Sequence, residues 1–176
     1  KIYDEMIDFA KYAFNKSHAA AYAVVSYQTA WLKYYYPVEF MAALMTSVID
    51  NPGKVSEYIY SCRQMGIKIL PPDINKGEGS FSVDGGNIRY GLAAIKSIGK
   101  PVIESIIQER KNGGEFSNLK DFIERLSGKE VNKRTIESFI KSGAFDSLGG
   151  TRKQFMVVYV QILDQVTRER KYSMTG

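Results

Sequence analysis

The residues best suited to chemistry lie together near the N-terminus, in the run Asn15, Lys16, Ser17 and His18, at the predicted start of a long helix. Asn15 or Ser17 can cap that helix, and the alanines that follow favour it. Because the first N–H groups of a helix lack partners and its dipole is positive there, Lys16, Ser17 and His18 are suited to bind a phosphate. Tyr22 follows one turn later and can stack on a base or sugar. The pattern predicts a triphosphate site, and the alternative is that His18 is a surface or capping residue.

A second set of candidates is the run Ser97, Ile98, Gly99 and Lys100, which precedes a helix predicted over residues 101–111. A short helix, a tight turn and a second helix are typical of a helix-hairpin-helix. In that motif the N–H groups of the turn and of the next helix bind a DNA phosphate without reading sequence. Lys100 adds positive charge, and Ser97 stands where the usual hairpin has a glycine. The alternative is an ordinary αα-hairpin with no ligand.

A weaker copy of this outline spans residues 131–149, with Lys133 and Arg134 at the predicted start of its helix. Two such units form a recurrent scaffold, so the sequence predicts a tandem arrangement. The chain has 176 residues and a net charge of +5, and residues 132–176 carry eight Lys/Arg against four Asp/Glu. This basic part suits a polyanionic partner, and the alternative is an ordinary solvated surface.

Groups for catalysis are not evident. Nucleotidyl transfer needs carboxylates that hold two metal ions, whereas Asp73 and Asp84 are isolated and the acidic residues at positions 4, 5 and 8 fit the solvated face of one helix. No Walker A loop, Ser-His-Asp set or dinucleotide fingerprint is present. One histidine and one cysteine argue against zinc, and Cys62 is predicted to be a core residue in a reducing compartment. We expect no metal site, no catalytic residue and no membrane span in this chain.

The elements that must position these residues are mostly helices. Periodic patterns predict helices over residues 3–14, 18–36, 38–50, 54–65, 92–96, 101–111, 117–126, 132–142 and 151–171. A short strand over 67–70 and a hairpin with strands 81–83 and 88–90 separate two helical groups. Ser117 and Asn132 are predicted N-caps, and Gly66 is predicted to end a helix. The fold is therefore predicted to be mainly α, with a boundary near residues 70–80.

The helix predicted over residues 18–36 is apolar around much of its circumference, so we expect it to be largely buried. Trp31 and the tyrosines at 34–36 are assigned to that core. The alternative is an interaction scaffold in which these aromatic residues form a partner surface. The first residue is Lys and the sequence starts inside a helical pattern, so the chain is expected to be a piece of a longer protein.

Runs of residues along most of the chain resemble the alpha-subunit family of bacterial replicative DNA polymerase III. In order they are residues 14–22, 26–29, 36–44, 65–67 with 70–75, 89–96 and 142–146. The resemblance implies four parts. These are the C-terminal part of the polymerase fingers (1–72), a linker with a small β element (73–91), a tandem helix-hairpin-helix DNA-binding region (92–150) and a C-terminal helix (151–176).

The family extends a DNA primer, so the resemblance implies that the parent protein is a DNA-directed DNA polymerase, a nucleotidyltransferase of DNA replication. The catalytic aspartates and their Mg²⁺ would lie in a palm domain outside residues 1–176, and this segment alone would be inactive and hold no cofactor. By resemblance, Lys16 or His18 would neutralise or protonate the pyrophosphate leaving group. The implied nucleotide contacts are Asn15, Lys16, Ser17, His18 and Tyr22. The implied DNA contacts are Ser97, Ile98, Gly99, Lys100, Lys133 and Arg134.

The implied partners are primer-template DNA, a deoxynucleoside triphosphate and the remaining polymerase domains. The sliding clamp and other replisome subunits would bind through regions outside this segment. The implied location is the bacterial cytoplasm, at the nucleoid-associated replisome. The alternative from another class is a non-catalytic, sequence-independent helix-hairpin-helix module that binds DNA.

Overall fold

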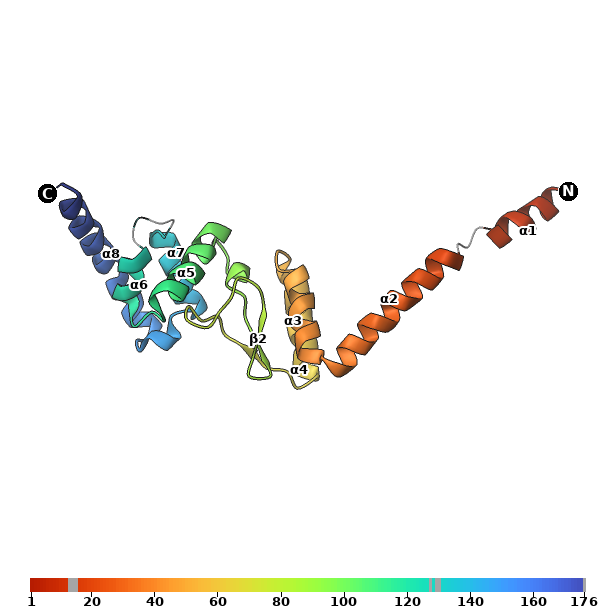
Figure 1. Cartoon of the computed structure of the whole chain (residues 1–176), viewed down its shortest axis with the longest axis horizontal. Coiled ribbons are helices and arrows are strands. Elements are labelled where there is room, and N and C mark those ends of the chain that lie inside the picture. Colours follow the sequence, from red (N-terminus) through yellow and green to blue (C-terminus); the bar gives the residue numbers. More distant parts are fainter. Residues whose placement is uncertain (13–15, 127, 129–130, 176) are drawn as a thin grey trace.

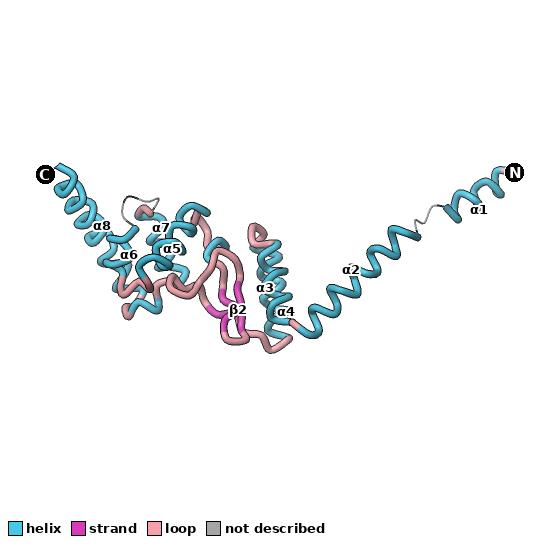
Figure 2. The backbone as a smooth tube through the Cα atoms, in the orientation of Figure 1, coloured by secondary structure: helices cyan, strands magenta, loops and turns pink. Residues whose placement is uncertain are grey.

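The computed structural model describes residues 1–12, 16–126, 128 and 131–175, and within them the chain is elongated and mainly α (Figure 1). Two helices at the N-terminal end reach away from the rest, and the last helix extends from the opposite end. A small sheet lies between the two helical groups (Figure 2). The predicted mainly α fold with one small β element is confirmed.

The N-terminal part consists of α1 (Ile2–Tyr12), α2 (Lys16–Tyr35), α3 (Pro37–Ser47) and α4 (Pro52–Gln64). Pro37 and Pro52 lie in the first turns of α3 and α4, where a missing N–H breaks no helical hydrogen bond. The Asn51 side chain caps α4 by accepting a hydrogen bond from the Lys54 N–H at 3.1 Å. Gly66 follows α4 with a φ of +74°, so the prediction that it ends this helix is confirmed.

Three short strands form the sheet: β1 (Ile69–Leu70), β2 (Ser82–Asp84) and β3 (Asn87–Arg89). Their order is β1-β3-β2, with β1 parallel and β2 antiparallel to β3. Gly85 and Gly86 have φ values of +57° and +76°, which a tight hairpin of type I′ requires. The Arg89 guanidinium donates to Asp84 at 2.5 and 3.0 Å and to the Pro71 carbonyl at 3.0 Å. These bonds tie the hairpin to the chain that follows β1.

The C-terminal part consists of η1 (Leu92–Ala94), α5 (Lys100–Gly113), α6 (Leu119–Leu126), α7 (Lys133–Ser142), η2 (Asp146–Leu148) and α8 (Arg152–Thr175). The prediction of an α-helix over residues 92–96 is wrong, because this segment is a single 3₁₀ turn and the backbone is extended at Ile95. The N-cap predicted at Ser117 is also wrong, since the Asn118 side chain accepts the Asp121 N–H at 2.9 Å. Asn132 caps α7 as predicted.

The larger hydrophobic core lies among η1, α5, α6, α7 and α8. Phe122 of α6 is fully buried, and its ring centroid lies 5.1 Å from that of Phe116, 6.1 Å from Phe139 and 4.9 Å from Phe145. Edge-on contacts of this kind favour one arrangement of the rings. The core therefore fixes the four helices that surround the predicted hairpins.

A smaller core packs α3 and α4 against the sheet. Met41, Met45 and Ile88 are fully buried there. The Phe81 N–H donates to the Thr46 hydroxyl at 3.1 Å and so joins the sheet to α3. Cys62 is buried in the same core, as predicted, and burial raises the pKa of its thiol.

The prediction that α2 is largely buried is wrong for this chain. None of its described residues is buried, and the side chains of Trp31 and Tyr34 are 42% and 78% exposed. A helix that is apolar on all sides needs neighbours on all sides. Here α2 packs against α3 near its C-terminal end and otherwise extends away from the body (Figure 1). The aromatic residues assigned to a core thus lie on the surface.

Candidate nucleic-acid interface

The hairpin before α5 is built on an unusual backbone conformation at Ser97. Its φ is +70°, and among the described residues it is the one non-glycine residue with a positive φ. A side chain in this region costs about 1–2 kcal/mol, which is why glycine usually occupies it. The Ile98 N–H donates back to the Ile95 carbonyl at 3.3 Å and closes the turn. Ser97 therefore adopts the conformation that the hairpin glycine would supply.

This turn leads directly into the start of α5. Gly99 is the N-cap residue, Lys100 begins the helix and Pro101 lies in its first turn. Within the described part of the chain, no protein group accepts the N–H of Gly99 or Lys100 and no acidic side chain pairs with Lys100. Both residues are exposed, while Ile98 packs against the larger core. The arrangement offers N–H donors, a positive helix end and a cation to an anion in solvent.

Arg134 connects the two predicted hairpin units. It lies in the first turn of α7, and its Nη2 donates to the Ser97 hydroxyl at 3.1 Å. Lys133, its neighbour, points elsewhere and forms an ion pair with Asp164 of α8 at 3.2 Å. Of the two basic residues predicted together, the structure brings Arg134 to the hairpin and places Lys133 against α8.

The hairpin region is fastened to the loop that precedes it by one arginine of α5. Arg110 donates to the Ile74 carbonyl at 3.1 Å, to the Gly77 carbonyl at 2.8 Å and to the Glu78 carboxylate at 2.9 Å. These three bonds cross more than thirty residues of sequence. They hold the loop over residues 73–80 against α5, the helix that the turn at Ser97 precedes.

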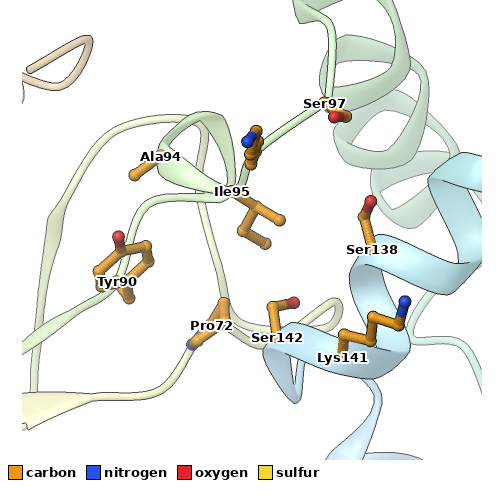
Figure 3. A pocket seen from close by; sticks show the side chains of 9 residues that line it. Pro72, Tyr90, Ala94, Ile95, Ser97, Ser138, Lys141 and Ser142 are labelled. Carbon is orange, nitrogen blue, oxygen red and sulfur yellow. The ribbon is translucent and has the colours of Figure 1, made fainter. Parts of the chain in front are cut away.

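A cavity of about 550 Å³ opens beside the hairpin, between residues 90–97 and α7 (Figure 3). Sequence reasoning did not assign its residues on α7, which are Ser138, Lys141 and Ser142. Their spacing of three and four residues was the available signal, because it places them on one helix face. Ser97 lines the same cavity, so the cavity and the hairpin share a residue.

The other predicted cluster lies at the start of α2. Lys16, Ser17 and His18 are exposed in its first turn, and Asn15 lies outside the described residues. The ring centroids of His18 and Tyr22 are 4.5 Å apart with planes tilted by 51°, so these two side chains share one face. Ser17 lies inside the helix, which makes the alternative assignment of Ser17 as N-cap wrong.

The two clusters do not meet in this chain. In Figure 1 the start of α2 lies toward one end of the elongated chain, whereas α5 and α7 lie in the body near the other end. In the residues that the structure describes, no group of three or more His, Cys, Asp or Glu side chains is close enough to hold a metal ion. No helix in the described ranges has the length and apolar character of a bilayer span.

Comparison with known proteins agrees with this geometry. Residues 66–155 match the family model described as the helix-hairpin-helix motif, so the chain belongs to that family. The chain is also 44% identical, over 99% of its length, to the DNA polymerase III subunit alpha of Mycobacterium tuberculosis. It is 54% identical to the Escherichia coli protein of the same name and 53% identical to that of Vibrio cholerae, each over 89% of the chain.

These matches cover a small share of the relatives. The chain spans 15% of the length of the Mycobacterium tuberculosis protein and 14% of each of the other two. The resemblance to the alpha subunit of DNA polymerase III, drawn from the order of short motifs, is therefore confirmed, and it concerns one segment of that protein.

Proposed function

We propose that this chain is a DNA-contacting and nucleotide-contacting segment of a bacterial replicative DNA polymerase, whose nucleotidyl transfer takes place on carboxylates outside the segment. The observation that carries the proposal is the hairpin at Ser97, with its exposed N–H groups at the start of α5 and Arg134 beside it. Such a turn binds a phosphate through the backbone and is indifferent to base sequence. The similarity to alpha subunits over nearly the whole chain supports the polymerase assignment.

In this proposal the residues of the hairpin hold the duplex backbone. The N–H groups of Gly99 and Lys100 bind one phosphate, and the Lys100 ammonium neutralises it. Arg134 fixes the turn through Ser97 and adds a second positive charge. Lys133 contributes less, because Asp164 already neutralises it. The backbone contacts position the DNA and leave base selection to the template.

The cluster on α2 would serve the incoming nucleotide. Lys16 and His18 are exposed in the first turn of α2, and the Tyr22 ring lies beside that of His18 at a tilt of 51°. They would bind the triphosphate and stabilise the charge that develops on pyrophosphate. Mg²⁺ would be held by the carboxylates outside the segment. The proposed partners are primer-template DNA, a deoxynucleoside triphosphate, the remaining polymerase domains and the replisome with its clamp, in the bacterial cytoplasm.

Binding of a labelled primer-template to this chain, followed by fluorescence anisotropy over a range of salt, tests the DNA contact. Lys100→Ala should weaken binding equally for unrelated sequences and lower the slope of log K against log salt by about 0.9. Lys120→Ala is the matched control, because Lys120 is a half-exposed lysine paired with Glu124 on α6. Equal affinities and slopes for both variants would contradict the proposal.

A second candidate is a DNA-binding module with no nucleotide site, and the separation of the α2 cluster from the hairpin favours it. The two functions are told apart in the polymerase that contains this segment. Lys16→Ala and His18→Ala should each slow single-turnover incorporation while leaving primer-template affinity unchanged. Unaltered incorporation rates for both variants would leave the module as the better assignment.

A further inference from the structure

The cavity beside the hairpin has two walls of different chemistry (Figure 3). One wall is apolar and comes from the linker and the 3₁₀ turn, with Pro72, Tyr90, Ala94 and Ile95. Tyr90 is half-buried, and its ring packs edge-on against Phe81 at a centroid distance of 5.0 Å. The aromatic wall is thus held in place by the core beneath it.

The opposite wall is polar and comes from α7, with Ser138, Lys141 and Ser142. The hydroxyl groups supply donors, and Lys141 supplies a positive charge that Glu137 partly offsets through an ion pair. Lys96 lines the cavity as well, and in the described residues it has no acidic partner. The cavity is therefore apolar on one side and electropositive on the other.

The hairpin end of the cavity is already a candidate phosphate site. Ser97 lines the cavity and accepts a hydrogen bond from Arg134 at 3.1 Å. A volume of about 550 Å³ falls within the 300–1,000 Å³ of ordinary ligand pockets. A ligand that suits both walls has a flat apolar part at one end and an anion at the other, and a nucleotide has both.

We propose that this cavity binds one unpaired nucleotide of a DNA strand, with its base against Tyr90 and Pro72 and its phosphate toward Lys96, Lys141 and Arg134. The base must be unpaired because stacked and paired bases of a duplex do not present a face to a protein wall. Grooves for single strands combine positive charge with an aromatic platform in this way. The proposal rests on the proposed function, since it takes the neighbouring hairpin to be a DNA-backbone site.

Photocrosslinking locates the base. A short single-stranded oligonucleotide that carries 5-iododeoxyuridine is irradiated with this chain, and the crosslinked peptide is identified by mass spectrometry. We expect the crosslink at Tyr90. A crosslink confined to the exposed aromatic residues of α2, such as Trp31 and Tyr34, would overturn the proposal.

Binding measurements separate this site from the hairpin. Lys141→Ala and the cavity-filling Ser138→Leu should weaken a short single strand about fivefold or more and change blunt-duplex affinity less than twofold. Circular dichroism of each variant checks that α7 is intact, and Lys120→Ala is the matched control. Equal losses of affinity for the single strand and the duplex would make the cavity part of the duplex site and overturn the proposal. No loss of affinity for either DNA would also overturn it.

Two further arms complete the test. Lys100→Ala should weaken the duplex, and its failure to do so counts against the proposed hairpin function while the crosslink still reports on the cavity. Deoxythymidine monophosphate should compete with the oligonucleotide only at much higher concentration. Competition at equal concentration would assign the cavity to a free nucleotide and overturn its assignment to a strand.

Discussion

The aromatic residues of α2 and those around Phe122 are both numerous, but their surroundings are opposite. Trp31 and Tyr34 are 42% and 78% exposed, whereas Phe122 and Phe139 are fully buried. The helices α5 to α8 pack on one another around Phe122, while α2 has no second layer over most of its length. Apolar composition gives a segment the capacity to be buried, and chain topology decides whether it is.

The same difference separates the two candidate sites. Ser97 is held by a closed turn, by Arg134 and by the core beneath Ile98. Lys16 and His18 are held by the α2 helix to which they belong, on a face that this chain leaves exposed. A site that is fixed by contacts from several elements can bind without help, and one that lies on an open helix needs another surface to complete it.

The largest predicted effect compares one aromatic residue from each region. Phe122→Ala should lower the free energy of unfolding by about 3–5 kcal/mol, because it leaves a cavity in a close-packed core. Trp31→Ala should change it by about 0.5 kcal/mol or less, because an exposed side chain loses little on truncation. Urea denaturation followed by circular dichroism measures both. A loss at Trp31 as large as that at Phe122 would show that α2 is packed in solution and would remove the contrast.

Gly91 lies where two backbone segments pack closely next to the predicted DNA-binding hairpin. A Cβ atom there would lie 2.7 Å from the Ser80 carbonyl carbon and 2.9 Å from the Phe81 nitrogen, and neither can move independently of the chain. Gly91→Ala should therefore destabilise the fold by about 1–3 kcal/mol. Gly53 is the matched control, because a Cβ in its helical position meets one atom at 3.4 Å. Gly53→Ala should stabilise by about 0.5 kcal/mol, and equal losses at both glycines would contradict this account.

Ser97 gives an intermediate effect in which two terms oppose each other. Ser97→Gly removes the strain of a positive φ but also removes the hydroxyl that accepts from Arg134. Ser97→Ala removes the hydroxyl and keeps the strain. The glycine variant should thus be more stable than the alanine variant by about 1 kcal/mol, as measured by urea denaturation. Equal stabilities would mean that the turn relaxes out of the left-handed region when the hydroxyl is lost.

How far the sequence predicted these features depends on the range of the interaction. Gly66, Asn132 and the Gly85–Gly86 turn were readable because their conformations follow from local chemistry. Burial of α2 was predicted because the helix is apolar around much of its circumference, but burial depends on neighbours that the composition of one helix does not specify.

The candidate site was also predicted only in part: its local features were predicted and its long-range contacts were not. The hairpin before α5 was found from the residue types at positions 97–100 and the helical pattern that follows them, and Ser97 was noted there as a departure from glycine. Its bond to Arg134 joins residues 37 positions apart, and the cavity joins residues 72 and 142, so neither has a local signal. The division of Lys133 from Arg134 depends on Asp164 of α8 and was equally out of reach.

The smallest predicted effect is a pH dependence that comes from two ion pairs, one in the β-hairpin and one between η2 and α8. Hydrogen bonds from Arg152 hold the pKa of the Asp146 carboxyl below its ordinary value, and those from Arg89 do the same to the pKa of Asp84. A carboxyl group whose pKa is lower in the folded chain stabilises the fold above its unfolded pKa, which is about 3.9 for aspartate. That contribution is lost as the pH falls through the folded value, because protonation then breaks the pair.

The urea concentration at the midpoint of unfolding should therefore decrease when the pH is lowered from 6 to 3. Asp146→Asn should make this decrease smaller, because it removes one of the groups whose pKa is shifted. Asp164→Asn is the control, since Asp164 makes a single contact with Lys133 at 3.2 Å, whereas Asp146 accepts three hydrogen bonds from Arg152. Hydrogen exchange should show a smaller effect of acid on the amide protons of α1 and α2, which do not depend on either pair, than on the amide protons of the packed region. If acid unfolded the two regions in parallel, the Asp84 and Asp146 carboxylates would not selectively stabilise the packed region. The electrostatic difference between the two regions would then be contradicted.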